Sequence, residues 1–194
     1  MSAATPAPTP APTPIRILGA TAHRIATAGA AELTLQEVAE AAGVSKALIH
    51  YHFKDKAELL TRVAGWLAGE VVERESRTLD EVAPAHAIDA LWRWLDGELA
   101  RGDVRVLLDL ATVPADGVRD AVREAAQARR AAAARTVQRL FGVLSLTPRV
   151  PVTLMADVLV AFVDGMALDA TLAPERNHRV AFDVFWLAML SLAE

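Results

Sequence analysis

Cysteine is absent from this chain of 194 residues, and its absence excludes two kinds of structure. Without thiols the protein can form neither a disulfide framework nor a thiolate metal site. The nearest pair of histidines, His50 and His52, would point about 200° apart on a helix and could not readily share one ion. The sequence therefore predicts no metal centre and no bound cofactor.

Catalytic motifs are also lacking. An enzyme would need a nucleophile beside a base, or paired carboxylates at helical spacing, and the nearest approach is Asp157 with Asp164. A solvated or interface edge explains that pair better, so we do not expect an enzyme. The most apolar stretch is interrupted by these two residues and Asp169, each of which would cost on the order of a few kcal/mol in lipid. A membrane span is therefore not expected.

Residues 1–14, MSAATPAPTPAPTP, have neither the charged segment nor the apolar core of a secretory signal. Half of the ten prolines lie in this stretch, which predicts a disordered, polyproline-like arm over residues 1–13. The arm has no Lys or Arg, which argues against a role in the DNA minor groove. The remaining prolines fall where helical patterns start or stop, and no strand signal competes. The fold class is therefore predicted to be all-α.

The most informative pattern is TLQEVAEAAGVSKALIHYHFKDKAELL, residues 34–60. Thr34 and Glu37 have the spacing of a capping box, which predicts a helix start. Gly43 ends that helix, since glycine tolerates the left-handed conformation of a helix terminus. Ser45 is a good N-cap for a second helix from Lys46 to about residue 52. Two short helices joined by a three-residue turn predict a helix-turn-helix DNA reader.

The second helix of this pair would keep Ile49 and Phe53, four residues apart, on its inner side. Its outer side suits a DNA major groove, because amine and imidazole groups donate to base edges or phosphates and aliphatic groups contact thymine methyls. The outer residues are Lys46, Ala47, Leu48, His50, Tyr51 and His52. We add Thr34 and Ser45, at the two helix starts, to the expected DNA-binding set.

A third helix is predicted to begin at Lys56, capped by Asp55 and Glu58. A phosphate there would meet both the ammonium group and the positive end of the helix dipole. The charge distribution supports this placement: the chain has a net charge of −4, yet its three lysines, Lys46, Lys54 and Lys56, lie within eleven residues. Such a local basic patch is typical of a small DNA-binding module, although a solvated helix end is the plainer alternative.

The segment GVSKALIHYHFKDKAELL, residues 43–60, closely resembles the DNA-binding segment of TetR-type transcriptional regulators. The resemblance covers residues 15 to about 62 at the level of motifs. It implies that the second helix reads the major groove and that Lys56 binds a phosphate. It also implies a cytoplasmic regulator, most often a repressor, with a small-molecule effector. Where the family usually has tyrosine this chain has His50, and Tyr51 follows.

The helical pattern predicts an N-terminal three-helix DNA-binding domain over residues 14–60 and a C-terminal helical ligand-binding and dimerisation domain over residues 61–194. The first helix is expected from about Ile15 to Ala28, with Thr13 as its N-cap and Ile15, Leu18, Ala22 and Ile25 on one side. The helix that begins at Lys56 is expected to reach about Thr78 and to link the two domains. Further helices are expected near residues 85–100, 104–112, 116–144, 150–172 and 176–192.

A ligand site in the second domain is a weaker prediction. Trp94 falls off the apolar stripe of its helix, which makes it a candidate contact, although an amphipathic tryptophan at a helix edge explains it as well. Apolar residues could line a pocket between helices, with Arg93, Asp109 or Thr112 orienting a ligand, but core packing explains them equally. The candidate ligand-binding residues are Trp66, Trp92, Trp94, Leu107, Leu108, Asp109 and Val122.

The last two helices are the most apolar. In TetR-type proteins the corresponding pair packs against a second copy in a four-helix interface, so the resemblance implies a homodimer, and simple core burial is the alternative. The expected interface residues are Met155, Leu159, Phe162, Gly165, Met166, Phe182, Phe185, Trp186 and Met189.

We therefore expect a DNA-binding regulator that recognises a palindromic operator on double-stranded DNA and responds to an unknown effector. The alternative is a helical small-molecule-binding or scaffold protein whose DNA-reading head is inactive. The intact turn and Lys56 count against that alternative.

Overall fold

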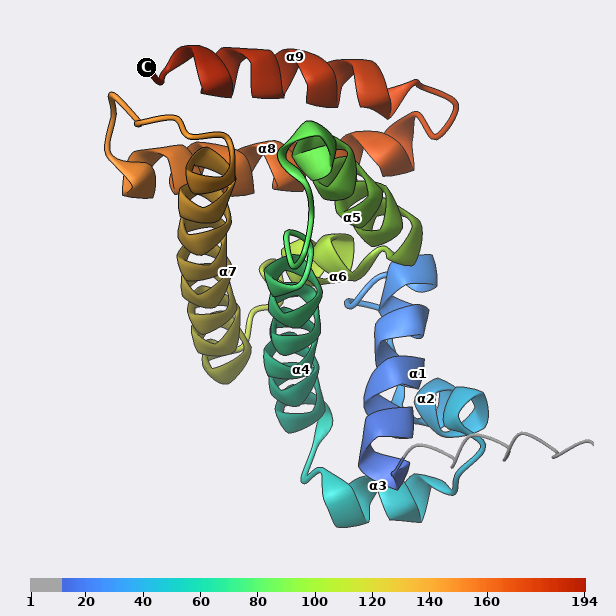
Figure 1. Ribbon diagram of the computed structural model, residues 1–194. Coiled ribbons are helices and arrows are strands. Elements are labelled where there is room, and N and C mark those ends of the chain that lie inside the picture. The colour runs from blue at the N-terminus through green and yellow to red at the C-terminus, as the bar shows by residue number, and fades with distance from the viewer. Residues whose placement is uncertain (1–11) are drawn as a thin grey trace, which may run out of the picture.

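The computed structural model describes residues 12–194, which form nine α-helices and one short 3₁₀ helix and contain no strand (Figure 1). The all-α prediction is confirmed. The helices are α1 (Thr13–Ala28), α2 (Leu35–Ala42), α3 (Lys46–His52), α4 (Lys56–Ser76), α5 (Ala87–Arg101), α6 (Asp103–Leu110), α7 (Asp116–Val143), α8 (Val152–Leu172) and α9 (His178–Ser191), with the 3₁₀ helix at Pro84–His86. The predicted arm lies outside the described residues except for its last two.

The helix-turn-helix forms where the sequence predicts it. Thr34 and Glu37 make a reciprocal capping box, in which each side chain accepts a hydrogen bond from the other residue's backbone N–H. Gly43 ends α2 with φ of 63°, a left-handed conformation that costs glycine little. Ser45 caps α3, and its hydroxyl oxygen accepts from the Leu48 N–H. Local backbone chemistry therefore sets the turn.

Helix α1 differs from the prediction in two details. It begins at Thr13 after Pro12, so Thr13 is the first helical residue and not the cap. Ile15 is 38% exposed, whereas Ile17 is fully buried and continues the stripe that includes Ile25. Two isoleucines close together both suit an apolar stripe in the sequence, and only the packing of α1 against α2 and α4 selects one of them.

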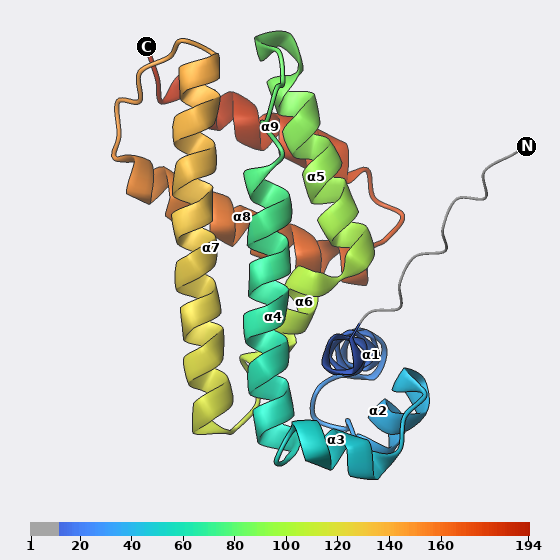
Figure 2. The same ribbon diagram turned by 60° about the horizontal axis from the view of Figure 1, so that its bottom comes forward.

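The long helices α4 and α7 lie side by side, and α8 and α9 lie across the end of the molecule far from α3 (Figures 1 and 2). Buried apolar residues form two clusters. The first surrounds α1, α2 and α3 and takes in Leu107 and Leu110 of α6; the second lies among α5, α7, α8 and α9. Helix α4 contributes to both, with Leu59 in the first and Val71 in the second. The boundary expected near residue 60 is thus crossed by continuous packing.

Candidate nucleic-acid interface and interior cavity

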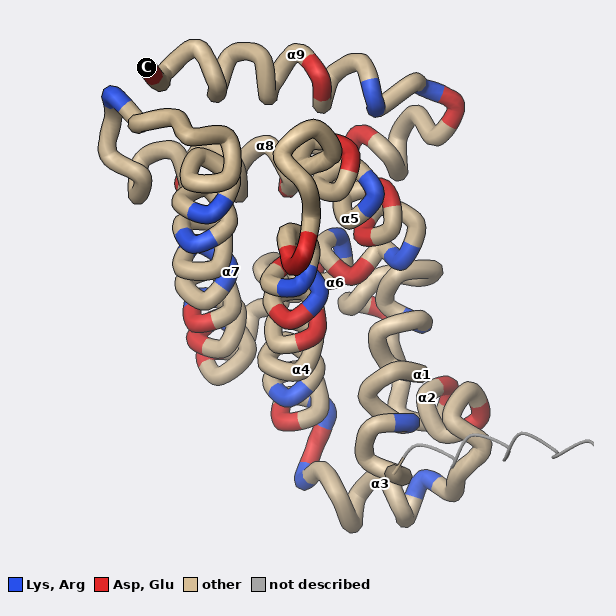
Figure 3. Tube along the Cα trace, in the orientation of Figure 1, with Lys and Arg blue, Asp and Glu red and all other residues tan. Residues whose placement is uncertain are grey.

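Helix α3 lies at one extremity of the molecule and carries no acidic residue (Figure 3). Ile49 is fully buried and Phe53 is 4% exposed, as the sequence predicts, so these two side chains anchor the helix. Tyr51 is 81% exposed. The proposed contact residues Lys46, Ala47 and His50 are also exposed, while Leu48 and His52 are partly buried. The caps Thr34 and Ser45 are exposed at the starts of α2 and α3.

The first turn of α4 has the predicted N-cap, with one difference from the expected pairing. Asp55 caps the helix by accepting from the Glu58 N–H. The Glu58 carboxylate does not return to Asp55, however, and instead accepts from the Lys54 N–H. The Lys56 ammonium donates to the backbone carbonyl of Ala31 at 3.2 Å. Lys56 thus holds the loop between α1 and α2, residues 29–34, in the protein without DNA.

The same loop is held from a second side by α6. The Ala30 backbone N–H donates to Asp109 Oδ2 at 2.7 Å, and Gly29, with φ of 85°, lets the chain turn there after α1. Arg16 on α1 donates to the Ala42 carbonyl at 2.8 Å, at the end of α2. Asp109 was a candidate ligand contact, and the structure places it at this joint between the head and the rest of the chain.

The other candidate ligand residues are distributed over both cores. Leu107 is buried in the first cluster, and Trp66 and Val122 pack against it, whereas Trp92 packs against the second cluster beside Phe182. Leu108 is partly buried on α6. Only Trp94 lines an interior cavity.

That cavity lies between α4, α5, α7 and α8. Its polar lining comes from Glu75 on α4, Trp94 on α5 and Arg129 on α7, and aliphatic side chains form the rest of the wall. The space left is about 10 Å³, enough for about one water molecule. Burial raises the pKa of the Glu75 carboxyl group from 4.5 to about 7, although the Thr136 hydroxyl donates to its Oε1 at 2.8 Å.

Neither Glu75 nor Arg129 is among the residues predicted from the sequence. One signal was available for Glu75, which follows Leu67, Ala68 and Val71 on the buried stripe of α4 and is the only charged residue on it. For Arg129 no such signal exists, because α7 carries arginines on several sides. Only the meeting of four helices identifies the two residues as neighbours.

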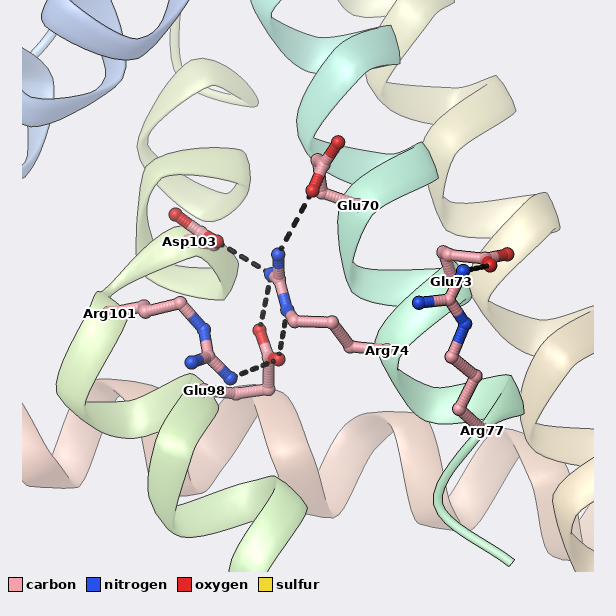
Figure 4. A network of polar contacts seen from close by, with 7 residues as sticks. All are labelled: Glu70, Glu73, Arg74, Arg77, Glu98, Arg101 and Asp103. Atoms are coloured by element: carbon pink, nitrogen blue, oxygen red, sulfur yellow. Dashed lines mark hydrogen bonds and ion pairs between the residues drawn. The ribbon is translucent and has the colours of Figure 1, made fainter. Parts of the chain in front are cut away.

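A network of partly buried ion pairs, centred on Glu98, ties α4 to α5 and α6 beside this cavity (Figure 4). Glu98 of α5, whose side chain has no exposed surface, accepts from Arg74 Nε at 2.6 Å and from Arg101 at 2.9 Å. Arg74 also reaches Asp103 at 2.6 Å. The hydrogen bonds that Arg74 donates to Glu98 raise the pKa of Arg74, and burial raises the pKa of Asp103. The three helices are thereby fixed near the middle of the molecule.

The α8–α9 pair presents to solvent different residues from those predicted for the interface. Six of the nine expected interface residues are at most 5% exposed and lie in the chain's own second core: Met155, Leu159, Met166, Phe182, Trp186 and Met189. Phe162 and Phe185 stack on each other at 4.0 Å between ring centroids, and Gly165 is exposed. The exposed apolar residues are Leu154, Val158, Leu168, Leu172, Val180, Val184 and Leu187. We call this second set the outer face.

Two features are absent from residues 12–194. No helix in this range is long and apolar enough to cross a membrane. No group of three or more His, Asp or Glu side chains in the same range is arranged to hold a metal ion.

The exposed α3, its two buried anchors and the capped turn before it define a helix-turn-helix DNA-binding protein. Residues 17–63 match the family model of bacterial regulatory proteins, tetR family. The matched residues run from α1 into the start of α4, so this part of the chain is similar to the DNA-binding segment of that family of regulators.

Solved structures agree with this fold over almost the whole chain. A TetR-family transcriptional regulator from Rhodococcus sp. is 24% identical, with a TM-score of 0.73, and the match covers 93% of this chain and 97% of that one. NemR of E. coli in its reduced form is 15% identical, with a TM-score of 0.74 and coverage of 94% and 98%. FadR of Bacillus subtilis in complex with stearoyl-CoA is 14% identical, with a TM-score of 0.71 and coverage of 91% and 97%. No curated protein matches this chain.

Proposed function

We propose that this regulator is a homodimeric repressor that binds a palindromic operator and is released from it by a small-molecule effector. The main support for DNA binding is the outward face of α3, which is free of acidic residues and projects beyond the rest of the molecule. In the proposed complex the two copies of α3 occupy successive major grooves about one helical turn apart. The protein would then act in the cytoplasm, where the DNA is.

The outer face of α8 and α9 supports the homodimer. Its seven exposed aliphatic side chains lie on two adjacent helices, and contiguous apolar surface of this kind marks an interaction site. Two copies related by a twofold axis would bury both pairs in a four-helix interface. The residues predicted from the sequence would then support the interface from beneath, with Gly165 at its surface. They are Met155, Leu159, Phe162, Gly165, Met166, Phe182, Phe185, Trp186 and Met189.

An effector in the second domain would act through α4. The cavity wall includes Glu75 near the end of α4, and the same helix begins at Lys56 beside the reading helix. A ligand that binds the DNA-incompetent arrangement of α4 better than the competent one would shift the equilibrium away from DNA. FadR of Bacillus subtilis, which shares this fold, has been crystallised with stearoyl-CoA. The shared fold supports the proposal that this chain also binds a small-molecule effector.

The first experiment is selection of duplexes from a random pool by the parent and by Lys56→Ala at one salt concentration. We expect the parent to enrich a palindrome. We expect Lys56→Ala to bind all selected duplexes more weakly. The slope of log K against the logarithm of the salt concentration should fall in magnitude by about one, because one phosphate contact is lost. Failure of the folded, ligand-free parent to enrich any sequence would reject the operator proposal and favour the scaffold alternative.

The dimer is tested by Leu187→Glu, which puts a charge in the middle of the outer face. We expect the dimer dissociation constant, measured by analytical ultracentrifugation, to rise at least about 100-fold, because two carboxylates would be desolvated in one interface. Ile15→Glu is the matched control, since Ile15 is also an exposed apolar residue but lies on α1. A monomeric parent, or equal effects of the two variants, would contradict the assignment of this face.

A further inference from the structure

One ionisable group that lines the interior cavity has no ion-pair partner among the described residues. Arg129 donates to Asp164 of α8 at 2.6 Å and is thereby paired. Glu75 is 5% exposed and receives a hydrogen bond from the Thr136 hydroxyl, but none of the ion pairs among residues 12–194 includes it. A buried carboxyl group without a cationic partner is costly to ionise.

The charged groups that act on Glu75 come from α7 and α5. Arg129 and Arg135 of α7 favour its ionised form, and Glu98 of α5 opposes it. Two of these groups are already paired with opposite charges. Arg129 is paired with Asp164, and Glu98 is paired with Arg74 and Arg101. The net result favours the protonated form at neutral pH more than is usual for a glutamate. A positively charged ligand in the cavity could therefore form an ion pair with Glu75.

Trp94 provides a second and independent indication of a ligand. Its indole Nε1 is buried and has no hydrogen-bond partner among the described residues. Buried indole N–H groups normally have a partner, because an unsatisfied donor costs about 1–3 kcal/mol. The indole ring also lines the cavity, and an aromatic face attracts organic cations. Val71, Leu159 and Val163 complete an apolar wall suited to alkyl groups.

We propose that this cavity is a binding site for small organic cations, in which Glu75 pairs with the charged nitrogen and Trp94 forms the aromatic wall. An oxygen on the ligand would accept the unpaired Trp94 N–H. This inference names the effector class for the proposed function and rests on it for its regulatory meaning. The space now present is sized for about one water molecule, so a cation must move Glu75 and the end of α4 outward to enter.

Binding in this site is coupled to protons. The cation pairs with the ionised carboxylate, so binding shifts the protonation equilibrium of Glu75 toward the ionised form and releases protons to solvent. With the pKa of Glu75 at about 7 in the empty site, about half a proton is released at pH 7. For a ligand with a permanent charge, affinity rises about tenfold between pH 6 and pH 8, because the ionised fraction of Glu75 rises by that factor.

The test uses three probes of nearly the same size and different charge. Choline is a permanent cation with a hydroxyl oxygen, 3,3-dimethylbutanol is its neutral isostere, and 3,3-dimethylbutyrate carries the same alkyl group on an anion. Each is titrated into the full-length protein by calorimetry at pH 6, 7 and 8, in buffers of different ionisation enthalpy, so that the number of protons exchanged is measured. We expect choline to bind most tightly, with the pH dependence and proton release given above.

Glu75→Gln is expected to weaken choline binding at pH 8 about tenfold or more and to abolish its pH dependence, while binding of 3,3-dimethylbutanol is unchanged. Glu73→Gln is the matched control, because Glu73 is an exposed glutamate on the same helix, and choline binding should not respond to it. The parent's proton release decides the question without any variant, should Glu75→Gln fail to fold.

Three results would overturn the proposal. One is tighter binding of 3,3-dimethylbutyrate, which would point instead to the cleft on the outer side of Trp94, lined by Arg74, Arg77 and Arg93. Another is equal affinity for choline and its neutral isostere. The third is the absence of choline binding to the folded parent.

These titrations contain no DNA, so they fail or succeed separately from the proposed function. Choline binding with proton release, together with no loss of operator binding, would keep the site and reject its role as an effector site. Operator binding without choline binding would keep the proposed DNA-binding function and reject the cation site.

Discussion

The DNA-reading head and the C-terminal domain differ in where they place their polar chemistry. In the head, Lys46, His50 and Tyr51 stand on the surface of a helix anchored by Ile49 and Phe53. In the C-terminal domain, Glu75, Glu98 and Arg129 lie inside, held by partners on other helices. The proposed DNA-contact residues of the head can therefore change with little effect on stability, whereas a change of the interior groups should affect stability and the proposed ligand binding together.

The largest effect is expected from Glu98→Ala. Removing this fully buried carboxylate leaves Arg74 and Arg101 without their shared partner, and we expect the free energy of unfolding to fall by about 3 kcal/mol. The matched variant Glu73→Ala removes an exposed pair with Arg77 and should cost no more than about 0.5 kcal/mol. Chemical denaturation of both variants measures the difference. Equal losses would mean that the interior network is not what joins α4 to α5 and α6.

A smaller and pH-dependent effect is expected from Glu75→Gln. The pKa of Glu75 is about 7 when folded and 4.5 as a model value, so the unfolded chain ionises first and the parent loses stability as pH rises from about 4.5 to 7. Glutamine has no such loss. Relative to the parent, the variant should gain about 2 kcal/mol between pH 5 and pH 8, as measured by denaturation at both values. A constant difference between the two proteins would contradict the raised pKa.

The capping box gives an intermediate case in the head. Thr34→Ala removes the oxygen that accepts from the Glu37 N–H and should lower the free energy of unfolding by about 1 kcal/mol. Thr34→Ser keeps the acceptor and is expected to behave like the parent. If both variants lose the same amount, the threonine acts through packing rather than through the cap.

The smallest effect on stability is expected from Tyr51→Ala, because the side chain is 81% exposed. We expect a change within about 0.5 kcal/mol, together with an altered preference among selected DNA sequences. Selection of duplexes beside thermal unfolding measures both. An unchanged sequence preference would remove Tyr51 from the reading face, and a large loss of stability would remove the contrast between the two regions.

The same contrast explains how much could be predicted from the sequence. The turn and the anchors of α3 depend on residues within about one helical turn of each other, so local periodicity was sufficient for Thr34, Gly43, Ser45 and Ile49. Glu75 meets Thr136 across 61 positions and Arg129 meets Asp164 across 35, and no local pattern carries such pairings.

The α8–α9 pair was difficult for another reason. Both sides of these helices are apolar, so periodicity could not separate the side packed in the chain's own core from the side left to solvent. The large aromatic residues and the methionines, including Phe182, Trp186 and Met189, went inward, and smaller aliphatic residues such as Val184 and Leu187 stayed outside. On α9 the buried side chains are thus the larger ones, whereas on α8 valine and leucine occur on both sides, with Val163 buried and Val158 exposed.

The loop between α1 and α2 is held by Lys56 from α4 and by Asp109 from α6, and both bonds end on backbone atoms of the loop. A backbone carbonyl or N–H is present whatever side chain the residue carries. Ala30 is buried, so its size is constrained, but Ala31 is exposed and its side chain takes no part in the bond. Over evolution residue 31 could therefore vary freely while the joint persists, and the mechanical link between the two regions would leave no trace there in an alignment of related sequences.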